Sequence, residues 1–228
     1  MEGKLIVIEG NDSSGKQTQT DLLIKQLSAK GFKVKEADFP QYYTSHFGEL
    51  IAKYLRGELG DIKHISPYFS TLLYAQDRFE AKKKLRNWLK KGNIVISNRY
   101  VPSNKAYGAA RLTSKKEQSE FIAWIDTLEY KINKIPRPDL IVYLKVPLQI
   151  AQDWITTKKK RDYLKGEEKD IHEKNLNYLK NVEKIYDSLS ENENWAEIDC
   201  IKQGRILNEQ EIHKKVWKVI KNRIIPQI

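Results

Sequence analysis

A glycine-rich segment near the beginning of the chain has residue types that suit a phosphate-binding loop. It reads Gly10, Asn11, Asp12, Ser13, Ser14, Gly15, Lys16, Gln17 and Thr18. Glycines let backbone N–H groups curl around phosphate oxygens, and the lysine can reach the β- and γ-phosphates of a nucleotide. The segment therefore predicts nucleotide phosphate binding in preference to an ordinary turn, but it does not specify the substrate.

The residue after this lysine departs from the usual pattern of such loops. A serine or threonine normally stands there, and its hydroxyl binds Mg²⁺. This chain has Gln17, followed by Thr18. A carboxamide oxygen is also a hard ligand, so Gln17 could hold magnesium, and a water molecule could fill the place instead.

A phosphate loop needs a strand before it and a helix after it, and the sequence predicts both. Lys4–Ile8 is a short β-rich run. Residues 16–30 suit a helix, because Leu23 and Leu27 lie one turn apart and Gly31 can end it.

Strands and helices continue to alternate along the rest of the chain. We expect strands at Lys33–Asp38, Asn93–Ser97, Leu140–Val146 and Trp195–Cys200, and helices at about 66–91, 115–132, 147–157, 171–190 and 208–223. Strands separated by helices form a parallel sheet covered on both faces. The predicted fold class is therefore α/β, with a three-layer, doubly wound, five-stranded parallel sheet in a single domain over residues 1–228.

The composition is that of a folded protein with excess positive charge. Of 228 residues, 40% are hydrophobic, and 41 Lys and Arg against 30 Asp and Glu give a net charge of +11. A disordered chain is excluded, no apolar run reaches the roughly 18 residues of a membrane span, and the single Cys200 excludes an internal disulfide. Without a secretory signal pattern, we expect a cytoplasmic protein with acidic partners: nucleic acid, an anionic membrane or phosphorylated small molecules.

Six segments of the chain resemble those of thymidylate kinases in their order and approximate spacing. They are IEGNDSSGKQTQ, FPQY, LLYAQDRFE, NRYVPSNKAYGAAR, RPDLIVYLKVP and DIHEKNLNYLKNVEKIYDSL. The resemblance covers nearly the whole chain. It implies a P-loop kinase with a short lid, which transfers the γ-phosphoryl group of ATP to dTMP with Mg²⁺, and it implies a homodimer.

Tyr74 and Arg78 are four residues apart, so they share one face of the expected helix. Phe69, Leu72 and Phe79 are expected on the opposite face, toward the core. The resemblance implies that Tyr74 stacks on the thymine base and that Arg78 bonds a thymine carbonyl.

Five further residues match the rest of the family's dTMP site. By resemblance, Asn104 contacts the thymine edge, and Tyr107 crowds the ribose 2′ position and so favours deoxyribose. Asp12 bonds the 3′-hydroxyl, and Phe39 and Pro40 lie beside dTMP.

Arg99 follows the strand expected at 93–97, where ligands bind in open α/β sheets. The resemblance implies that it contacts the phosphates of acceptor and donor, which makes Lys16 and Arg99 catalytic candidates. The family has Asp before this arginine and often has Arg at the place of Tyr42, whereas this chain has Asn98 and Tyr42. The acceptor is already an anionic phosphate at pH 7, so no general base is needed.

A basic segment at about 158–170 matches the family's lid, and Arg161 is its only arginine. Arg161 is the third catalytic candidate. The alternative is that the whole segment is a solvated run of charges. Asp170 and His172 match residues near dTMP and the metal.

The departures at Gln17, Tyr42 and Asn98 leave a second hypothesis open, in which the fold is the same but the acceptor differs: a deoxynucleoside or other monophosphate kinase. A non-catalytic P-loop protein that binds nucleic acid is a third hypothesis, based on the charge. Because basic residues are spread along the chain and no nucleic-acid-binding module occurs, we expect ATP and dTMP as partners, without nucleic acid or membrane.

Overall fold

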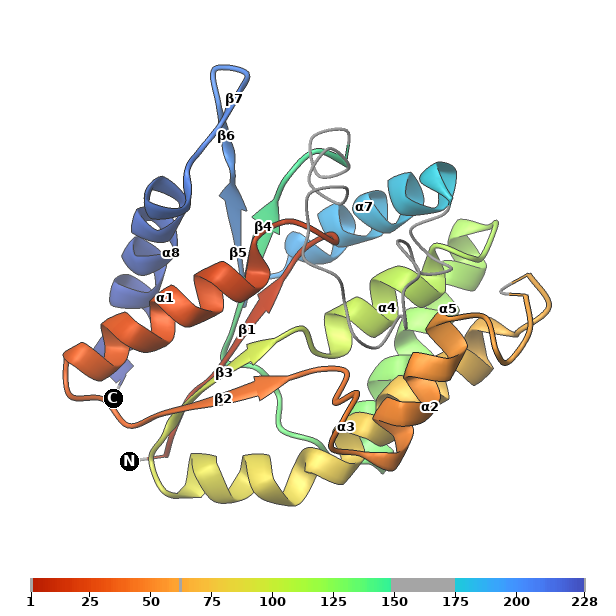
Figure 1. The fold of residues 1–228 in the computed structure, drawn as a ribbon, viewed down its shortest axis with the longest axis horizontal. Helices are drawn as coiled ribbons and strands as arrows, with labels where there is room; N and C mark the ends of the chain where they lie inside the picture. Colours follow the sequence, from red (N-terminus) through yellow and green to blue (C-terminus); the bar gives the residue numbers. More distant parts are fainter. Residues whose placement is uncertain (1, 62, 149–174, 228) are drawn as a thin grey trace.

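The computed structural model describes residues 2–61, 63–148 and 175–227. Five parallel strands form one sheet in the order β2-β3-β1-β4-β5 (Figure 1). Their bounds are β1 Leu5–Glu9, β2 Val34–Asp38, β3 Ile94–Asn98, β4 Leu140–Lys145 and β5 Trp195–Asp199. The α/β fold and the five-stranded parallel sheet predicted from the sequence are therefore confirmed.

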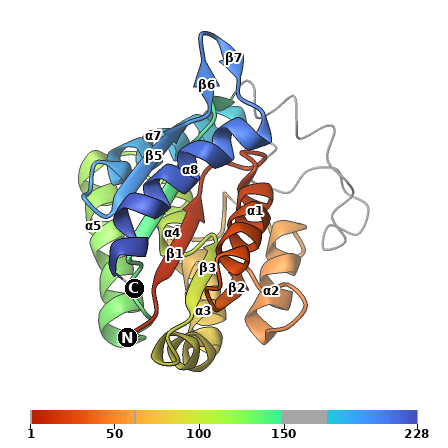
Figure 2. The same cartoon turned by 90° about the vertical axis from the view of Figure 1, so that its left-hand side faces the viewer.

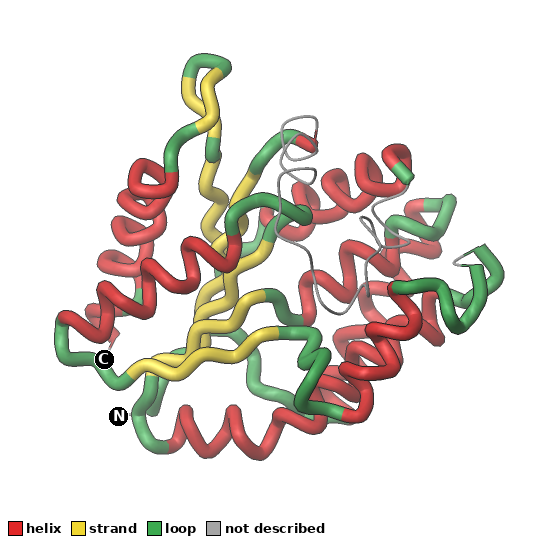
Figure 3. The backbone as a smooth tube through the Cα atoms, in the orientation of Figure 1, coloured by secondary structure: helices red, strands yellow, loops and turns green. Residues whose placement is uncertain are grey.

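The helices lie on both faces of this sheet (Figures 2 and 3). They are α1 Lys16–Ala29, α2 His46–Leu55, α3 Pro67–Lys90, α4 Val101–Ala109, α5 Lys115–Asp126, a π-helix at Thr127–Ile132, α7 Leu176–Ser190, α8 Glu209–Arg223 and a short 3-10 helix at Ile225–Gln227. Within the described residues, no helix is long and apolar enough to cross a membrane.

Both faces of the central strand β1 are buried. Leu5 and Val7 pack into the cluster formed with α3, α4, α5 and α7, whereas Ile6 and Ile8 pack into the cluster formed with α1 and α8. Alternate side chains of a strand point to opposite faces. A strand covered on both sides is therefore an uninterrupted apolar run, which explains why this strand is easily recognised in the sequence.

The outward side of α3 differs from the prediction. Phe69, Leu72 and Phe79 were expected in the core, but they are 53%, 36% and 43% exposed. The buried side of α3 instead carries Leu73, Leu85 and Arg78 together with smaller and polar residues, and part of this side lines a cavity.

Two α-helices, a short 3-10 helix and one hairpin of the described residues were not predicted. α2 and α4 are short, and a two-stranded antiparallel hairpin pairs β6 Ile201–Lys202 with β7 Arg205–Ile206. The helix expected over 115–132 divides into α5 and the π-helix. The lid and most of the helix expected at 147–157 lie outside the described residues.

Candidate active site

The phosphate loop lies at the carboxyl end of β1 and leads into α1. Gly10 has φ +148°, and a Cβ there would lie 2.6 Å from Ser14 Oγ and 2.8 Å from the Leu144 carbonyl oxygen. Gly15 has φ +83° at the N-cap of α1. Both positions require glycine, because a side chain would strain the backbone at each and would also collide at Gly10.

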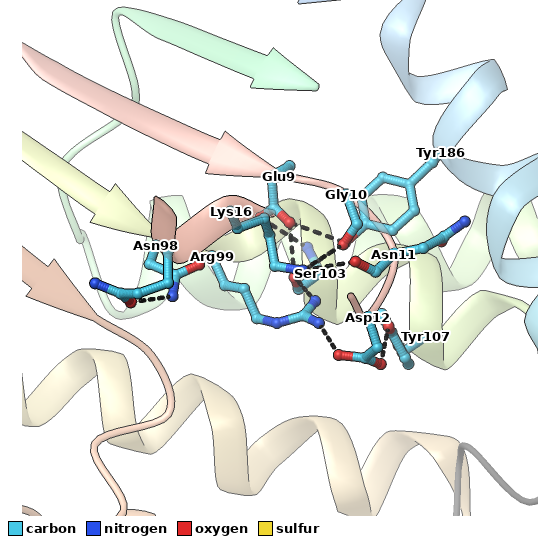
Figure 4. A network of polar contacts seen from close by, with 11 residues as sticks. Glu9, Gly10, Asn11, Asp12, Lys16, Asn98, Arg99, Ser103, Tyr107 and Tyr186 are labelled. Atoms are coloured by element: carbon cyan, nitrogen blue, oxygen red, sulfur yellow. Dashed lines mark hydrogen bonds and ion pairs between the residues drawn. The ribbon is translucent and has the colours of Figure 1, made fainter. Parts of the chain in front are cut away.

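Lys16 folds back over this loop. Its Nζ donates to the carbonyl oxygens of Gly10 at 3.1 Å and Asn11 at 2.7 Å (Figure 4). Its side chain is buried. The hydroxyl oxygens of Ser13 and Ser14 are buried without a hydrogen-bond partner among the described residues. Buried polar groups normally have partners, so this loop fits an anionic ligand with acceptor oxygens.

Arg99 bridges the end of β3 to the phosphate loop. Its Nη2 lies 2.5 Å from Asp12 Oδ1, and its guanidinium lies 5.3 Å from the centre of the Tyr107 ring. The Tyr107 hydroxyl donates to Asp12 Oδ2 at 2.7 Å. Burial, together with the charge of Asp12, raises the pKa of Tyr107, so this hydroxyl stays a donor. Arg99 itself has φ +62°, an uncommon conformation for a non-glycine residue that clusters at functional sites.

Glu9, the last residue of β1, is fully buried. Its Oε1 accepts from the backbone N–H groups of Tyr100 at 2.9 Å and Ser103 at 3.2 Å. Its Oε2 accepts from the hydroxyls of Ser103 at 2.7 Å and Tyr186 at 2.8 Å. Ser103 Oγ in turn accepts from Arg99 Nη1 at 2.9 Å. Glu9 therefore fixes the first turn of α4 and, through Ser103, the guanidinium of Arg99.

A cavity opens beside these groups between α3 and α4. It brings together eight residues that sequence reasoning assigned to dTMP: Asp12, Phe39, Pro40, Tyr74, Arg78, Arg99, Asn104 and Tyr107. Tyr42 also lines the cavity, at the position where the sequence lacks an arginine. Arg161, Asp170 and His172 lie outside the described residues.

Sequence reasoning missed Glu9, Ser103, Arg111 and Glu129. Arg111 lines the cavity and donates to Ser70 Oγ at 3.1 Å. Its place at the end of the NRYVPSNKAYGAAR segment was the only available signal. Glu9 was hidden as the end of an apolar strand. Glu129, in the π-helix, forms a buried ion pair with Arg78, but no local sequence pattern distinguishes it.

Gln17 and Asn98 face each other at the ends of α1 and β3. Asn98 Nδ2 donates to Gln17 Oε1 at 2.9 Å, while Gln17 Nε2 donates to Asp21 at 2.9 Å and Glu36 at 3.1 Å. Asn98 Oδ1 is buried without a partner among the described residues. Mg²⁺ prefers oxygen ligands and keeps several waters, so these carboxamide oxygens fit it. No group of three or more His, Cys, Asp or Glu side chains within the described residues could hold a metal alone.

Asp38 pairs with Asn98 in the parallel register of β2 and β3. Its side chain stays exposed at the rim, yet the protein around it removes enough water to raise its pKa to about 6. The nearby charge of Glu36 acts in the same direction, whereas Arg99, Lys16 and a hydrogen bond from Asn98 oppose it. The Asp38 carboxylate therefore lies on the strand next to Asn98, and Asn98 is the position at which the family has an aspartate.

A family model described as thymidylate kinase matches residues 8–212. The chain belongs to the thymidylate kinase family. Thymidylate kinase from Plasmodium falciparum is 32% identical over 218 residues, which cover 96% of this chain and 91% of the relative. Thymidylate kinase from Mycobacterium tuberculosis (strain ATCC 25618 / H37Rv) is 32% identical over 186 residues, which cover 82% and 85%.

A solved thymidylate kinase from Candida albicans has the same fold. Its TM-score is 0.73 at 24% sequence identity, and the match covers 97% of this chain and 92% of that one. The family resemblance inferred from six motifs is therefore confirmed over nearly the whole chain.

Proposed function

We propose that this chain catalyses transfer of the γ-phosphoryl group of ATP to dTMP, giving dTDP for dTTP synthesis. One observation carries the proposal: a single cavity joins the candidate base-reading residues Arg78 and Asn104 to Arg99, which adjoins the phosphate loop. A nucleoside monophosphate in this cavity would place its phosphate toward Arg99 and the loop.

Two cations of the described site would act on the phosphates. In the proposed reaction, the backbone N–H groups of the loop and Lys16 bind the phosphates of ATP, and Lys16 leaves its carbonyl partners to do so. Arg99 contacts the acceptor phosphate with a planar fork of donors. The acceptor oxygen is already anionic, so alignment and charge neutralisation accelerate the transfer without a general base.

In the dTMP subsite, we assign Tyr74 to base stacking, with Arg78 and Asn104 on the thymine edge. Tyr107 would lie against C2′, and Asp12 would accept from the 3′-hydroxyl. Phe39 and Pro40 form the wall beside dTMP.

We propose Mg²⁺ as the metal of this reaction. Gln17 and Asn98 would hold it through their carboxamide oxygens, together with ATP phosphates and water. When bound, it neutralises charge on the phosphates. We further propose a single domain with a lid at about 158–170, in which Arg161 contacts ATP while Asp170 and His172 lie near dTMP.

We propose a cytoplasmic homodimer. The exposed apolar residues Phe69, Leu72 and Phe79 on α3 support an interface between helices, because such side chains are stabilised when a partner covers them.

A coupled ADP-release assay with ATP, Mg²⁺ and a panel of nucleoside monophosphates tests the activity. The expected result is the highest kcat/KM for dTMP. Higher values for CMP, UMP, AMP and GMP would overturn the assignment. Arg78→Ala should raise KM for dTMP more than KM for ATP, and equal effects would contradict a base-contacting role.

A further inference from the structure

We propose that Glu129 sets the base specificity of the cavity by fixing the orientation of Arg78 and Asn104. This inference rests on the proposed function, in which these two side chains read the pyrimidine edge. Glu129 lies in the π-helix that follows α5 and is fully buried. π-helical turns are rare in proteins overall, and those that occur are often at functional sites.

Glu129 holds Arg78 through a buried ion pair. Arg78 Nε donates to Glu129 Oε1 at 3.0 Å, and Nη2 donates to the same oxygen. The side chains are 2% and 0% exposed. A guanidinium is planar, so two bonds on one edge fix the plane and leave Nη1 as the donor on the opposite edge. Arg78 lines the cavity, where that donor can meet a base carbonyl.

The same oxygen of Glu129 also determines how the Asn104 amide is turned. Asn104 Nδ2 lies 3.2 Å from Glu129 Oε1 and 3.2 Å from the Thr71 carbonyl oxygen. A carboxylate and a carbonyl accept hydrogen bonds and cannot donate them. The amide nitrogen must therefore face Glu129 and Thr71, and Asn104 presents its Oδ1 acceptor on the other side.

The resulting pair, a donor from Arg78 and an acceptor from Asn104, is complementary to thymine. The thymine edge offers a carbonyl acceptor at O4 and an N–H donor at N3. Cytosine carries the reverse, an amino donor at C4 and an acceptor at N3. An Asn104 amide turned by 180° would suit cytosine better. Glu129 opposes that rotation without touching the base, so it is a positioning residue.

A double-mutant cycle with Asn104→Asp and Glu129→Gln tests the contact. Asn104→Asp places carboxylate oxygen against Glu129 and Thr71 and should lower kcat/KM for dTMP at least 100-fold. Glu129→Gln keeps an acceptor for Arg78 and should cost less than tenfold. In the double variant the carboxamide oxygen at position 129 still accepts from Arg78 but no longer repels the carboxylate at position 104 with a like charge, so kcat/KM should recover at least tenfold over Asn104→Asp. Effects that simply multiply would overturn the proposed contact.

A second comparison uses dTMP against 5-methyl-dCMP, which keeps the methyl group and the sugar. Glu129→Met removes the acceptor and should shrink the kcat/KM ratio between these substrates at least tenfold. Glu129→Gln should leave the ratio within about threefold, whereas an unchanged ratio in a folded Glu129→Met variant would overturn the specificity role. If Glu129→Met does not fold, the double-mutant cycle decides the question.

Glu120 is an exposed glutamate on α5, and Glu120→Gln is the matched control. It should leave kcat/KM for both substrates unchanged. The increase in melting temperature caused by dTMP or by 5-methyl-dCMP, measured without ATP, reports the same base preference as relative binding. Failure of the wild type to phosphorylate dTMP would contradict the proposed function alone, because these shifts still report base preference. Retention of the preference in a folded Glu129→Met variant, with an active wild type, would contradict the role of Glu129 alone.

Discussion

Arg99 and Asp12 form an ion pair with 2.5 Å between Nη2 and Oδ1, and their side chains are only 16% and 20% exposed. The pair joins the end of β3 to the phosphate loop in the ligand-free protein. A partly buried cation without a counter-charge is destabilising, so Asp12 compensates Arg99, as a phosphate would in the proposed site. The Tyr107 hydroxyl donates to the same carboxylate, so in the proposed site the residue that would select the sugar is linked to the arginine that would bind phosphate.

Tyr107 should therefore contribute in two separable ways. Tyr107→Ala opens space at C2′ and should shrink the roughly 5- to 150-fold preference for dTMP over ribothymidine monophosphate, which follows from a cost of about 1–3 kcal/mol for burying an unpaired hydroxyl. Tyr107→Phe should keep this preference but lower kcat/KM for dTMP by about tenfold, because a hydrogen bond to a carboxylate is lost. Steady-state kinetics with both nucleotides measure the two effects.

The control for Tyr107 is Tyr43→Ala, since Tyr43 is 72% exposed. A dTMP-to-ribothymidylate ratio that stays constant in Tyr107→Ala would return Tyr107 to a packing role.

Lys16→Ala should lower kcat/KM at least tenfold, equivalent to about 1.4 kcal/mol of transition-state stabilisation. The reason is that Lys16 is the cation inside the phosphate loop, held by two loop carbonyls. Circular dichroism should show the fold retained. Lys25→Ala, on an exposed side of the same helix, should have wild-type kinetics. A folded Lys16→Ala enzyme with unchanged kcat/KM would remove Lys16 from the mechanism.

Gly108→Ala should destabilise the protein by about 1–3 kcal/mol through overpacking. In a helix interior, alanine is ordinarily favoured over glycine by about 1 kcal/mol. Here, however, a Cβ would lie 2.3 and 2.4 Å from Cε1 and Cζ of the fully buried Phe121 ring. The free energy of unfolding in urea measures the outcome.

A compensating change separates this collision from other effects of Gly108→Ala. Phe121→Leu shortens the obstructing side chain, so the double variant should be more stable than the sum of the two single changes predicts. A Gly108→Ala protein as stable as the wild type would contradict the packing argument.

Asp38 should make stability depend on pH in the magnesium-free protein. Its pKa is about 6 in the folded state against an ordinary 3.8, so the folded protein binds more protons than the unfolded chain between these values. This group therefore lowers the free energy of unfolding as pH rises through that window. The free energy of unfolding of Asp38→Asn minus that of the wild type should therefore be larger at pH 7 than at pH 4. Urea unfolding at both pH values measures it. Asp61→Asn, on a loop, serves as the control, and a pH-independent difference for Asp38→Asn would refute the shift.

The sequence predicts those parts of the molecule whose cause is local. The phosphate loop depends on glycine conformation and on an adjoining strand and helix, all within residues 5–29. Strand β1 is recognisable because both its faces are buried. Phe69 and Phe79 were expected in the core because they lie roughly opposite Tyr74 and Arg78, but the side of α3 that is buried depends on contacts with other segments of the chain.

The missed residues depend on long-range contacts. Glu129 acts on Arg78 and Asn104, which lie 51 and 25 positions away, and a π-helix has no simple repeat that sequence periodicity reveals. Family motifs identified Arg78 and Asn104 themselves, but not the carboxylate that orients them.

The partners of Glu9 determine when the phosphate site can be completed during synthesis. Its carboxylate accepts from Tyr100 and Tyr186, which follow it by 91 and 177 positions. A chain emerging from the ribosome N-terminus first therefore has its phosphate loop long before it has the donors that hold Glu9. Nucleotide binding by a nascent chain would accordingly report that α7 has docked, and it would mark a late stage of folding.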